Sequence, residues 1–298
     1  MLVLKSIIFL SLMAADNYAG EFQNLGVGAR ICAMGNTGIA QGEDPSVISL
    51  NPACSASLTR SFVLMHAENF SGIVKNEFGS VVIPKDNSAF GLGLQAIIVN
   101  NIKLTSLLND SLPLGPDNPP IVDDTVSTKD VIFYLNASQS KGLFAYGANL
   151  KVYYRDLYVL NGFGGGFDIG LKIILNNLNF GFAIRDFILA PIVWDNKSRE
   201  SIFPQFSIGL APQIPLPRMN SFFTLESDLI KKFAERGFEL NTGLEYRYKG
   251  IIAGRIGKTN ARYTFGAGLR YRKLNFDYAF LTHKDLGHSN KLSLKLEF

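Results

Sequence analysis

The sequence predicts an all-β protein, a transmembrane antiparallel β-barrel of about fourteen strands with an N-terminal plug or hatch segment in its lumen. Three observations predict this fold: an export signal at the N-terminus, apolar and polar residues that alternate over most of the chain, and connections that alternate between short and long. The composition agrees, because 47% of the 298 residues are hydrophobic, 12% are aromatic and only 18% are charged. Such a chain is not intrinsically disordered, and its 2 cysteines exclude a disulfide scaffold and a four-cysteine zinc site.

Residues 1–19 are predicted to form a signal peptide that is cleaved after export. A short basic start is followed by the apolar run 6–13 and then by Ala14, Ala15 and Ala19. This order is typical of a secretory signal, and a buried N-terminal strand or helix is the alternative. Beyond residue 20 no charge-free apolar stretch is long enough for a membrane-spanning helix, so the exported chain is either soluble or a β-barrel.

Residues 61–298 are predicted to form the barrel. The stretch 237–249 illustrates the pattern, because Leu240 and Leu244 share one face while Glu239 and Glu245 share the other. Strands of about 10–13 residues suit a tilted crossing of the hydrocarbon layer. The predicted strands are 61–70, 74–83, 88–100, 129–140, 142–155, 164–175, 177–187, 203–213, 219–229, 237–249, 250–258, 261–272, 273–282 and 290–298.

The connections between these strands support an outer-membrane barrel. Every second connection is a short turn, and most of the others are longer, above all 101–128 and 188–202. Bacterial outer-membrane barrels have short periplasmic turns, longer external loops and an even number of strands. An exported soluble β-sandwich is the alternative, but its strands would be shorter. We therefore expect the protein in the bacterial outer membrane, in contact with its lipids.

The segment 20–60 carries a series of glycine-rich and proline-containing motifs. Gly-Val-Gly-Ala-Arg occupies 26–30, Met-Gly-Asn-Thr-Gly occupies 34–38, and Asp-Pro-Ser at 44–46 precedes Asn-Pro-Ala at 51–53. This order resembles the FadL-like outer-membrane barrels, most closely their PorV/PorQ branch, and the ending 268–298 is similar to that branch as well. The resemblance implies that segment 20–60 folds as a plug or hatch inside the barrel.

Elementary conformational preferences also favour a compact insert at 20–60. Glycine and asparagine permit tight turns, Pro45 and Pro52 prevent a long helix, and the side chains of Asp44 and Asn51 can cap turns. The candidate plug and gating residues are Gly35, Asn36, Gly38, Asp44, Pro45, Ser46, Asn51, Pro52 and Ala53.

Cys32 and Cys54 stand where the resembled family usually has a small residue. In an oxidising compartment the two thiols could form a disulfide worth about 2–4 kcal/mol. Two free, buried cysteines are the alternative, and the sequence leaves both open.

Charged residues of both signs occupy the face of the predicted strands that points to the lumen. Because opposite charges can pair, we interpret them as a structural ion-pair lattice rather than a selectivity filter, which would favour one sign. The lattice candidates are Arg185, Glu239, Glu245, Arg247, Arg262, Arg270 and Asp277.

Outside the membrane, the 188–202 loop carries the only tryptophan, Trp194, within an apolar run. This residue is expected either to contact a hydrophobic ligand or to anchor at the lipid headgroups. Phe298 closes the last alternating strand and is typical of the C-terminal signal that barrel-assembly machinery binds during insertion. The sequence offers no persuasive metal site, cofactor motif, nucleic-acid surface or catalytic triad, so we predict a protein that is not an enzyme.

The resemblance implies two functions of different classes. FadL-like barrels imply passive passage of hydrophobic small molecules across the outer membrane. The PorV-like branch implies a part in type IX protein secretion, in which the barrel binds or shuttles secreted cargo proteins.

Overall fold

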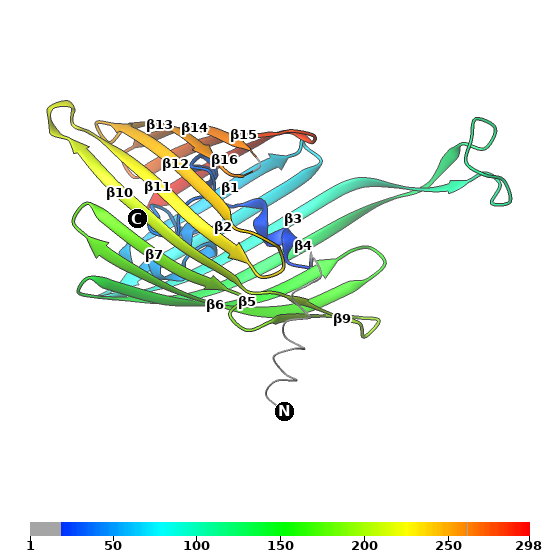
Figure 1. Ribbon diagram of the computed structural model, residues 1–298, viewed down its shortest axis with the longest axis horizontal. Coiled ribbons are helices and arrows are strands. Elements are labelled where there is room, and N and C mark those ends of the chain that lie inside the picture. Colours follow the sequence, from blue (N-terminus) through cyan, green and yellow to red (C-terminus); the bar gives the residue numbers. More distant parts are fainter. Residues whose placement is uncertain (1–18, 261) are drawn as a thin grey trace.

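The computed structural model describes residues 19–260 and 262–298 (Figure 1). The predicted signal peptide lies outside the described residues except for Ala19. No helix within the described part is long and apolar enough to cross a membrane.

Fourteen antiparallel strands close into a barrel, which confirms the predicted fold class. Consecutive strands pair along the chain, the first strand closes against the last with Ser61 opposite Glu297, and β7 pairs directly with β10. The fourteen barrel strands are β1 (Ser61–Asn69), β2 (Val74–Lys85), β3 (Ser88–Leu107), β4 (Pro120–Lys141), β5 (Phe144–Asp156), β6 (Asn161–Leu175), β7 (Leu178–Arg185), β10 (Gln205–Leu216), β11 (Ser221–Lys232), β12 (Glu239–Tyr248), β13 (Ile252–Lys258), β14 (Tyr263–Tyr271), β15 (Leu274–His283) and β16 (Gly287–Glu297). The short helix η4 (Pro217–Met219) lies in the β10–β11 turn.

Alternation along each strand separates the outer face of the barrel from the lumen. In β5, Leu150 is 51% exposed on the outer face, whereas the neighbouring Lys151 is 1% exposed on the inner face. A period of two places every second side chain on the same face, so the apolar outer band and the polar inner face follow directly from the sequence. The short turns gather at one end of the barrel, called the short-turn end, and the longer connections gather at the opposite, long-loop end.

The predicted loop 101–128 is instead a two-stranded ribbon that we call the arm, residues 100–128. β3 and β4 continue to pair beyond the barrel until Leu107 lies opposite Pro120. The strands on either side do not follow them. β2 pairs with β3 only as far as Val99, and β5 pairs with β4 only from Lys129 onward. The arm therefore projects far from the wall, drawn in cyan to green in Figure 1.

The predicted loop 188–202 also contains strands. β8 (Ala190–Trp194) and β9 (Arg199–Ile202) form a hairpin, and β8 pairs with β6 where Trp194 lies opposite Gly162. This hairpin extends the wall at the long-loop end without entering the closed barrel.

Residues 20–60, which we call the luminal segment, lie inside the barrel. They form η1 (Glu21–Leu25), α2 (Ala29–Ala33), η2 (Pro45–Ser49) and η3 (Pro52–Ser57), all drawn in blue in Figure 1. Almost every residue from 27 to 55 is buried, and contacts reach strands on opposite sides of the wall.

Candidate functional site

The helix α2 is tied to one side of the wall by a buried arginine. The guanidinium of Arg30 is 2% exposed and donates to Glu226 on β11 at 3.0 Å and to Glu245 on β12 at 3.2 Å. Burial alone would lower the pKa of Arg30, but the nearby carboxylates of Glu245, Glu43 and Glu226 outweigh it and raise the pKa above its ordinary value. This arginine is therefore a fixed positive charge inside the lumen.

Further ion pairs extend from Arg30 along the wall. Glu245 accepts from Arg255 at 2.6 Å and from Arg247 at 2.8 Å, and Arg255 reaches Asp277 on β15 at 2.7 Å. Arg247 also pairs with Glu43 of the luminal segment. The structure thus brings together three of the predicted lattice residues, Glu245, Arg247 and Asp277.

Glu43 is the carboxylate that the luminal segment contributes to this network. Burial would raise the pKa of Glu43, but the guanidinium groups of Arg30 and Arg247 outweigh burial and hold it below its ordinary value. Its backbone carbonyl also accepts from Lys295 on β16 at 2.6 Å. Glu43 therefore joins the segment to the last strand as well as to β12.

Four lattice candidates lie apart from this network. Arg185 and Glu239 lie at the long-loop end of their strands, and Arg262 lies in the β13–β14 loop. Arg270 is 3.3 Å from Glu297 with a side chain 44% exposed. Alternation shows that a side chain points into the lumen, but it does not show how far along the barrel axis that side chain lies. The sequence therefore could not tell which of these charges are close enough to pair.

Four network residues are not among the lattice candidates drawn from the sequence: Arg30, Glu43, Glu226 and Arg255. Arg255 occupies an inward position of β13, so the alternation of 252–258 contained the signal for it. Arg30 and Glu43 belong to the luminal segment, where no periodic pattern shows which side chain faces which wall.

The turns of the luminal segment are capped as its sequence suggested. The side chain of Asp44 accepts from the backbone N–H of Ser46 at 2.8 Å, and that of Asn51 accepts from Ala53 at 3.0 Å. Pro45 and Pro52 occupy the first turn of η2 and η3, where a missing N–H costs nothing. These caps allow two short helices to form in a segment that cannot form a long one.

Backbone groups of the segment bind the wall directly. The N–H of Gly38 donates to Asp228 at 2.8 Å, and the N–H of Gly35 donates to Thr264 at 3.0 Å. Asn36, between them, has a positive φ of 58°, which completes the turn. The predicted plug residues therefore serve as wall contacts and caps, and whether they act as a gate stays a prediction.

Wall glycines allow this close approach. A Cβ on Gly147 of β5 would lie 2.5 Å from the carbonyl oxygen of Pro52, and one on Gly181 of β7 would collide with the carbonyl oxygen of Ile39. Both contacts are with backbone, which cannot move aside as a flexible side chain can. Any larger residue at these positions would push the luminal segment away from the wall.

Beside β1–β5 the lumen holds a large apolar cluster. It borders a buried ion pair in which Lys151 of β5 lies 2.7 Å from Asp168 of β6 and 2.8 Å from Asp186. One continuous cluster joins luminal residues such as Val27 and Ile48 to the inner faces of β1–β5. It extends from Trp194 at the long-loop end to Ala89 at the start of β3, near the short-turn end. The members that lie on β1–β5 are Val63, Met65, Ala67, Phe78, Val82, Ala89, Ile97, Ile132, Tyr134 and Tyr153.

Trp194 is 4% exposed and belongs to this cluster, so the expected external anchor or exposed contact is wrong for this residue. Its ring lies 5.6 Å from the guanidinium of Arg155, which also covers the ring of Phe22 at 4.5 Å. The sequence pattern placed Trp194 in a loop, whereas alternation within β8 turns it inward and leaves Val193 exposed. Phe298, whose assembly role remains a prediction, is 55% exposed and donates its N–H to Arg60.

The two cysteines are free and buried, so the disulfide considered above is not formed. Cys32 packs with Ala29, Ala33 and Leu281, whereas Cys54 belongs to the large apolar cluster. Burial raises the pKa of the Cys54 thiol to about 11 and that of the Cys32 thiol above its ordinary value. Both thiols are therefore protonated at neutral pH.

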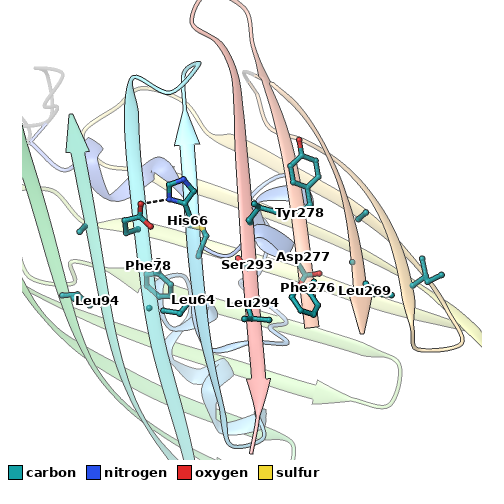
Figure 2. Close-up of a pocket in the computed structure, with 18 residues that line it drawn as sticks. Leu64, His66, Phe78, Leu94, Leu269, Phe276, Asp277, Tyr278, Ser293 and Leu294 are labelled. Atoms are coloured by element: carbon teal, nitrogen blue, oxygen red, sulfur yellow. Dashed lines mark hydrogen bonds and ion pairs between the residues drawn. The ribbon is translucent and has the colours of Figure 1, made fainter. Parts of the chain in front are cut away.

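The outer wall carries an apolar groove of about 970 Å³ across β1–β3 and β13–β16. Figure 2 shows Leu64, Leu94 and Leu294 along it, with the ring of His66 hydrogen-bonded to Glu77 at 2.6 Å. Small outward residues, such as Gly79 on β2 and Ala267 on β14, create the depression. Since the groove lies on the apolar outer face, the bilayer hydrocarbon would fill it.

Comparison with known proteins gives a fold but no family. No family model matches the chain, and no curated protein matches it. Among solved structures, the toluene transporter TbuX of Ralstonia pickettii is similar, with a TM-score of 0.62, 13% identity, and coverage of 92% of this chain and 98% of that one. The P. putida toluene transporter TodX has a TM-score of 0.61 at 11% identity over 92% of this chain and 99% of that one. The CymD monoaromatic hydrocarbon channel has a TM-score of 0.60 at 12% identity over 92% of this chain and 98% of that one.

Proposed function

We propose that the protein is an outer-membrane channel through which hydrophobic small molecules pass without energy input. The observation that carries the proposal is the continuous apolar cluster between β1–β5 and the luminal segment. It lies apart from the ion pairs of β11–β15 and borders the ion pairs that Lys151 makes with Asp168 and Asp186. A hydrocarbon loses little by entering apolar surroundings, but it cannot replace the hydrogen bonds of buried charges. The similarity in fold to hydrocarbon channels supports the same proposal.

In this proposal the long-loop end faces outward and the luminal segment is the plug. Apolar residues such as Ile188, which is 69% exposed, and Leu189 collect the substrate near the hairpin β8–β9. The substrate then moves between the luminal segment and β1–β3, as the packed side chains there give way. Residues 44–53 act as the gate because they include η2, which contacts β1–β3.

Uptake by reconstituted vesicles tests the proposal. Vesicles that contain lipopolysaccharide, a barrier to apolar solutes, should take up a hydrophobic fluorescent dye faster with the protein than without it. Ile48→Thr, which places a hydroxyl in the middle of the cluster, should slow this uptake. The matched control Ile251→Thr changes an exposed residue near the short-turn end and should not. Equal uptake by protein-containing and empty vesicles would refute the proposal.

The arm favours a second candidate, the PorV-like binding of secreted cargo. The arm exposes Leu108, Leu112 and Leu114 far from the barrel wall, where a protein partner could reach them. The similar structures named above are hydrocarbon channels and transporters, so this candidate rests on the arm and on the sequence motifs. Deletion of residues 101–128 should abolish copurification with a cargo C-terminal signal domain, and retention of the cargo would exclude the arm as its binding surface.

A further inference from the structure

A second, polar cavity lies at the long-loop end, outside the apolar cluster just described. It measures about 360 Å³ and lies between the luminal segment and the inner faces of β7 and β10–β13. This volume is at the lower end of the range for small-molecule sites, about 300–1,000 Å³.

Two arginines line this cavity without a carboxylate partner. Arg185 donates only to amide oxygens, at 2.6 Å to Gln205 and at 3.2 Å to Asn24. Arg262, in the β13–β14 loop, forms no ion pair with any of the described residues. Both arginines are partly buried, and two guanidinium groups without a carboxylate partner at one cavity favour an anionic ligand.

Lys232, the third cation of the cavity, is already neutralised. Its ammonium group lies 2.8 Å from Glu235, 3.1 Å from Glu239 and 3.6 Å from Glu21. Three carboxylates surround this one ammonium group, so Lys232 adds no free positive charge. Arg185 and Arg262 are the lining cations that have no carboxylate within 4.0 Å among the described residues.

Amide side chains supply the other polar groups of the cavity. Asn241 is only 4% exposed, and its carbonyl oxygen has no hydrogen-bond partner among the described residues. The carbonyl oxygen of Asn36 is likewise buried and unpartnered. Both side chains line the cavity, and an amide can turn either its donor or its acceptor toward a ligand. A hydroxylated ligand would give these buried amides the hydrogen bonds that they lack.

We propose that this cavity binds a small hydroxylated organic anion, of the hydroxy-acid or sugar-acid class. Arg185 and Arg262 supply the positive charge for its carboxylate, and Asn36 and Asn241 hydrogen-bond its hydroxyl groups. Apolar side chains, including Ile39, Leu50 and Phe70, cover its C–H faces.

Other ligand classes satisfy the cavity less well. A hydrocarbon would leave both arginines and both amides unpaired, and a neutral sugar would leave the arginines uncompensated. An alkyl carboxylate would satisfy the arginines but leave the amides unpaired. The site is therefore separate from the proposed hydrocarbon path and takes a different class of molecule.

Isothermal titration of the refolded full-length mature protein in detergent tests this site. The probes are D-gluconate, neutral D-glucose and octanoate, which carries a carboxylate without hydroxyl groups. The variants are Arg185→Gln, Arg262→Gln and Asn241→Leu, with Arg218→Gln at the opposite, short-turn end as the matched control. Heat-modifiable migration in electrophoresis shows whether each variant still forms a barrel.

We expect gluconate to bind at least tenfold more tightly than glucose and octanoate. Each arginine variant should lose at least tenfold in gluconate affinity, Asn241→Leu should lose the preference for gluconate over octanoate, and Arg218→Gln should match the parent protein. No gluconate binding, equal binding of glucose, tighter binding of octanoate, or unchanged affinity in folded arginine variants would each overturn the proposal. Because the dye-uptake assay uses no anion, failure of this site leaves the hydrocarbon proposal separately testable.

Discussion

Replacement of Arg30 by methionine tests whether the buried ion pairs hold the luminal segment in the barrel. The substitution keeps an unbranched side chain of similar length and removes the charge that Glu226 and Glu245 face. Loss of one partner from a buried ion pair costs about 3–5 kcal/mol. Glu245 retains Arg247 and Arg255, and Glu226 retains the hydroxyl of Thr37 at 3.1 Å, so we expect the lower end of this range.

A cost of about 3 kcal/mol raises the detached population of the luminal segment more than a hundredfold, because about 1.4 kcal/mol corresponds to a factor of ten. Cys32 and Cys54 lie within the segment and are completely buried, so a maleimide can modify them only when the segment leaves its place. The labelling rate in the folded barrel should therefore rise by about the same factor.

Two further variants make this result specific. Arg270→Met removes an exposed arginine paired with Glu297 and should change the labelling rate by less than fivefold, since such surface pairs contribute about 0–1 kcal/mol. When Glu226→Gln is added to Arg30→Met, labelling should become slower than in the single variant, because the carboxylate that lost Arg30 as its partner is now neutral. The reasoning is refuted if Arg30→Met labels at the parent rate while its barrel remains folded, or if Arg270→Met accelerates labelling equally.

Three other measurements follow from the same contacts. Gly181→Ala should loosen the segment and speed maleimide labelling, whereas Gly254→Ala, which points into open space on the outer face, should not; equal rates would contradict the wall-contact argument. Titration with a thiol reagent should find Cys32 and Cys54 unreactive at pH 8 in the native protein and two free thiols after unfolding, and fewer than two would restore the disulfide. The pKa of Glu43 is depressed in the folded state, so its stabilisation is complete above its unfolded pKa of about 4.3 and is lost as the pH falls through the lower folded value. Because maleimide reacts with the thiolate, the labelling rate is divided by that of the unfolded protein at the same pH; this ratio should rise as the pH falls through the folded value, and Glu43→Gln should remove that part of the pH dependence.

The barrel could be predicted from sequence because its signal is local and repeated. Alternation in 237–249 or 142–155 fixes which side chains face the lipid, and the fourteen predicted segments correspond to the fourteen barrel strands. The predicted strand boundaries are less accurate where two strands continue to pair beyond the barrel. The arm carries four prolines within 113–120 and four aspartates, features typical of a loop, yet β3 and β4 still pair to Leu107 and Pro120.

The candidate site could be predicted only in part, because its contacts join residues far apart in the chain. Asp44 and Asn51 could be identified as caps, since each acts on a neighbour two residues away. Arg30 and Glu226 are separated by 196 positions, and no local pattern relates them. The same limit applies to Arg185 and Arg262, which alternation assigned to one lattice although the structure leaves both without a carboxylate.

The two sides of the luminal segment are held by different forces, and this difference indicates where a substrate can pass. Toward β11–β15, Arg30 and Glu43 make directional ion pairs that must break before the segment can move. Toward β1–β3, η2 packs Val47 and Ile48 against apolar side chains such as Phe78. Apolar packing is non-directional, so a hydrocarbon can replace one set of such contacts with another at little cost. A substrate would therefore separate the luminal segment from β1–β3 while the ion pairs keep the segment attached to the opposite wall.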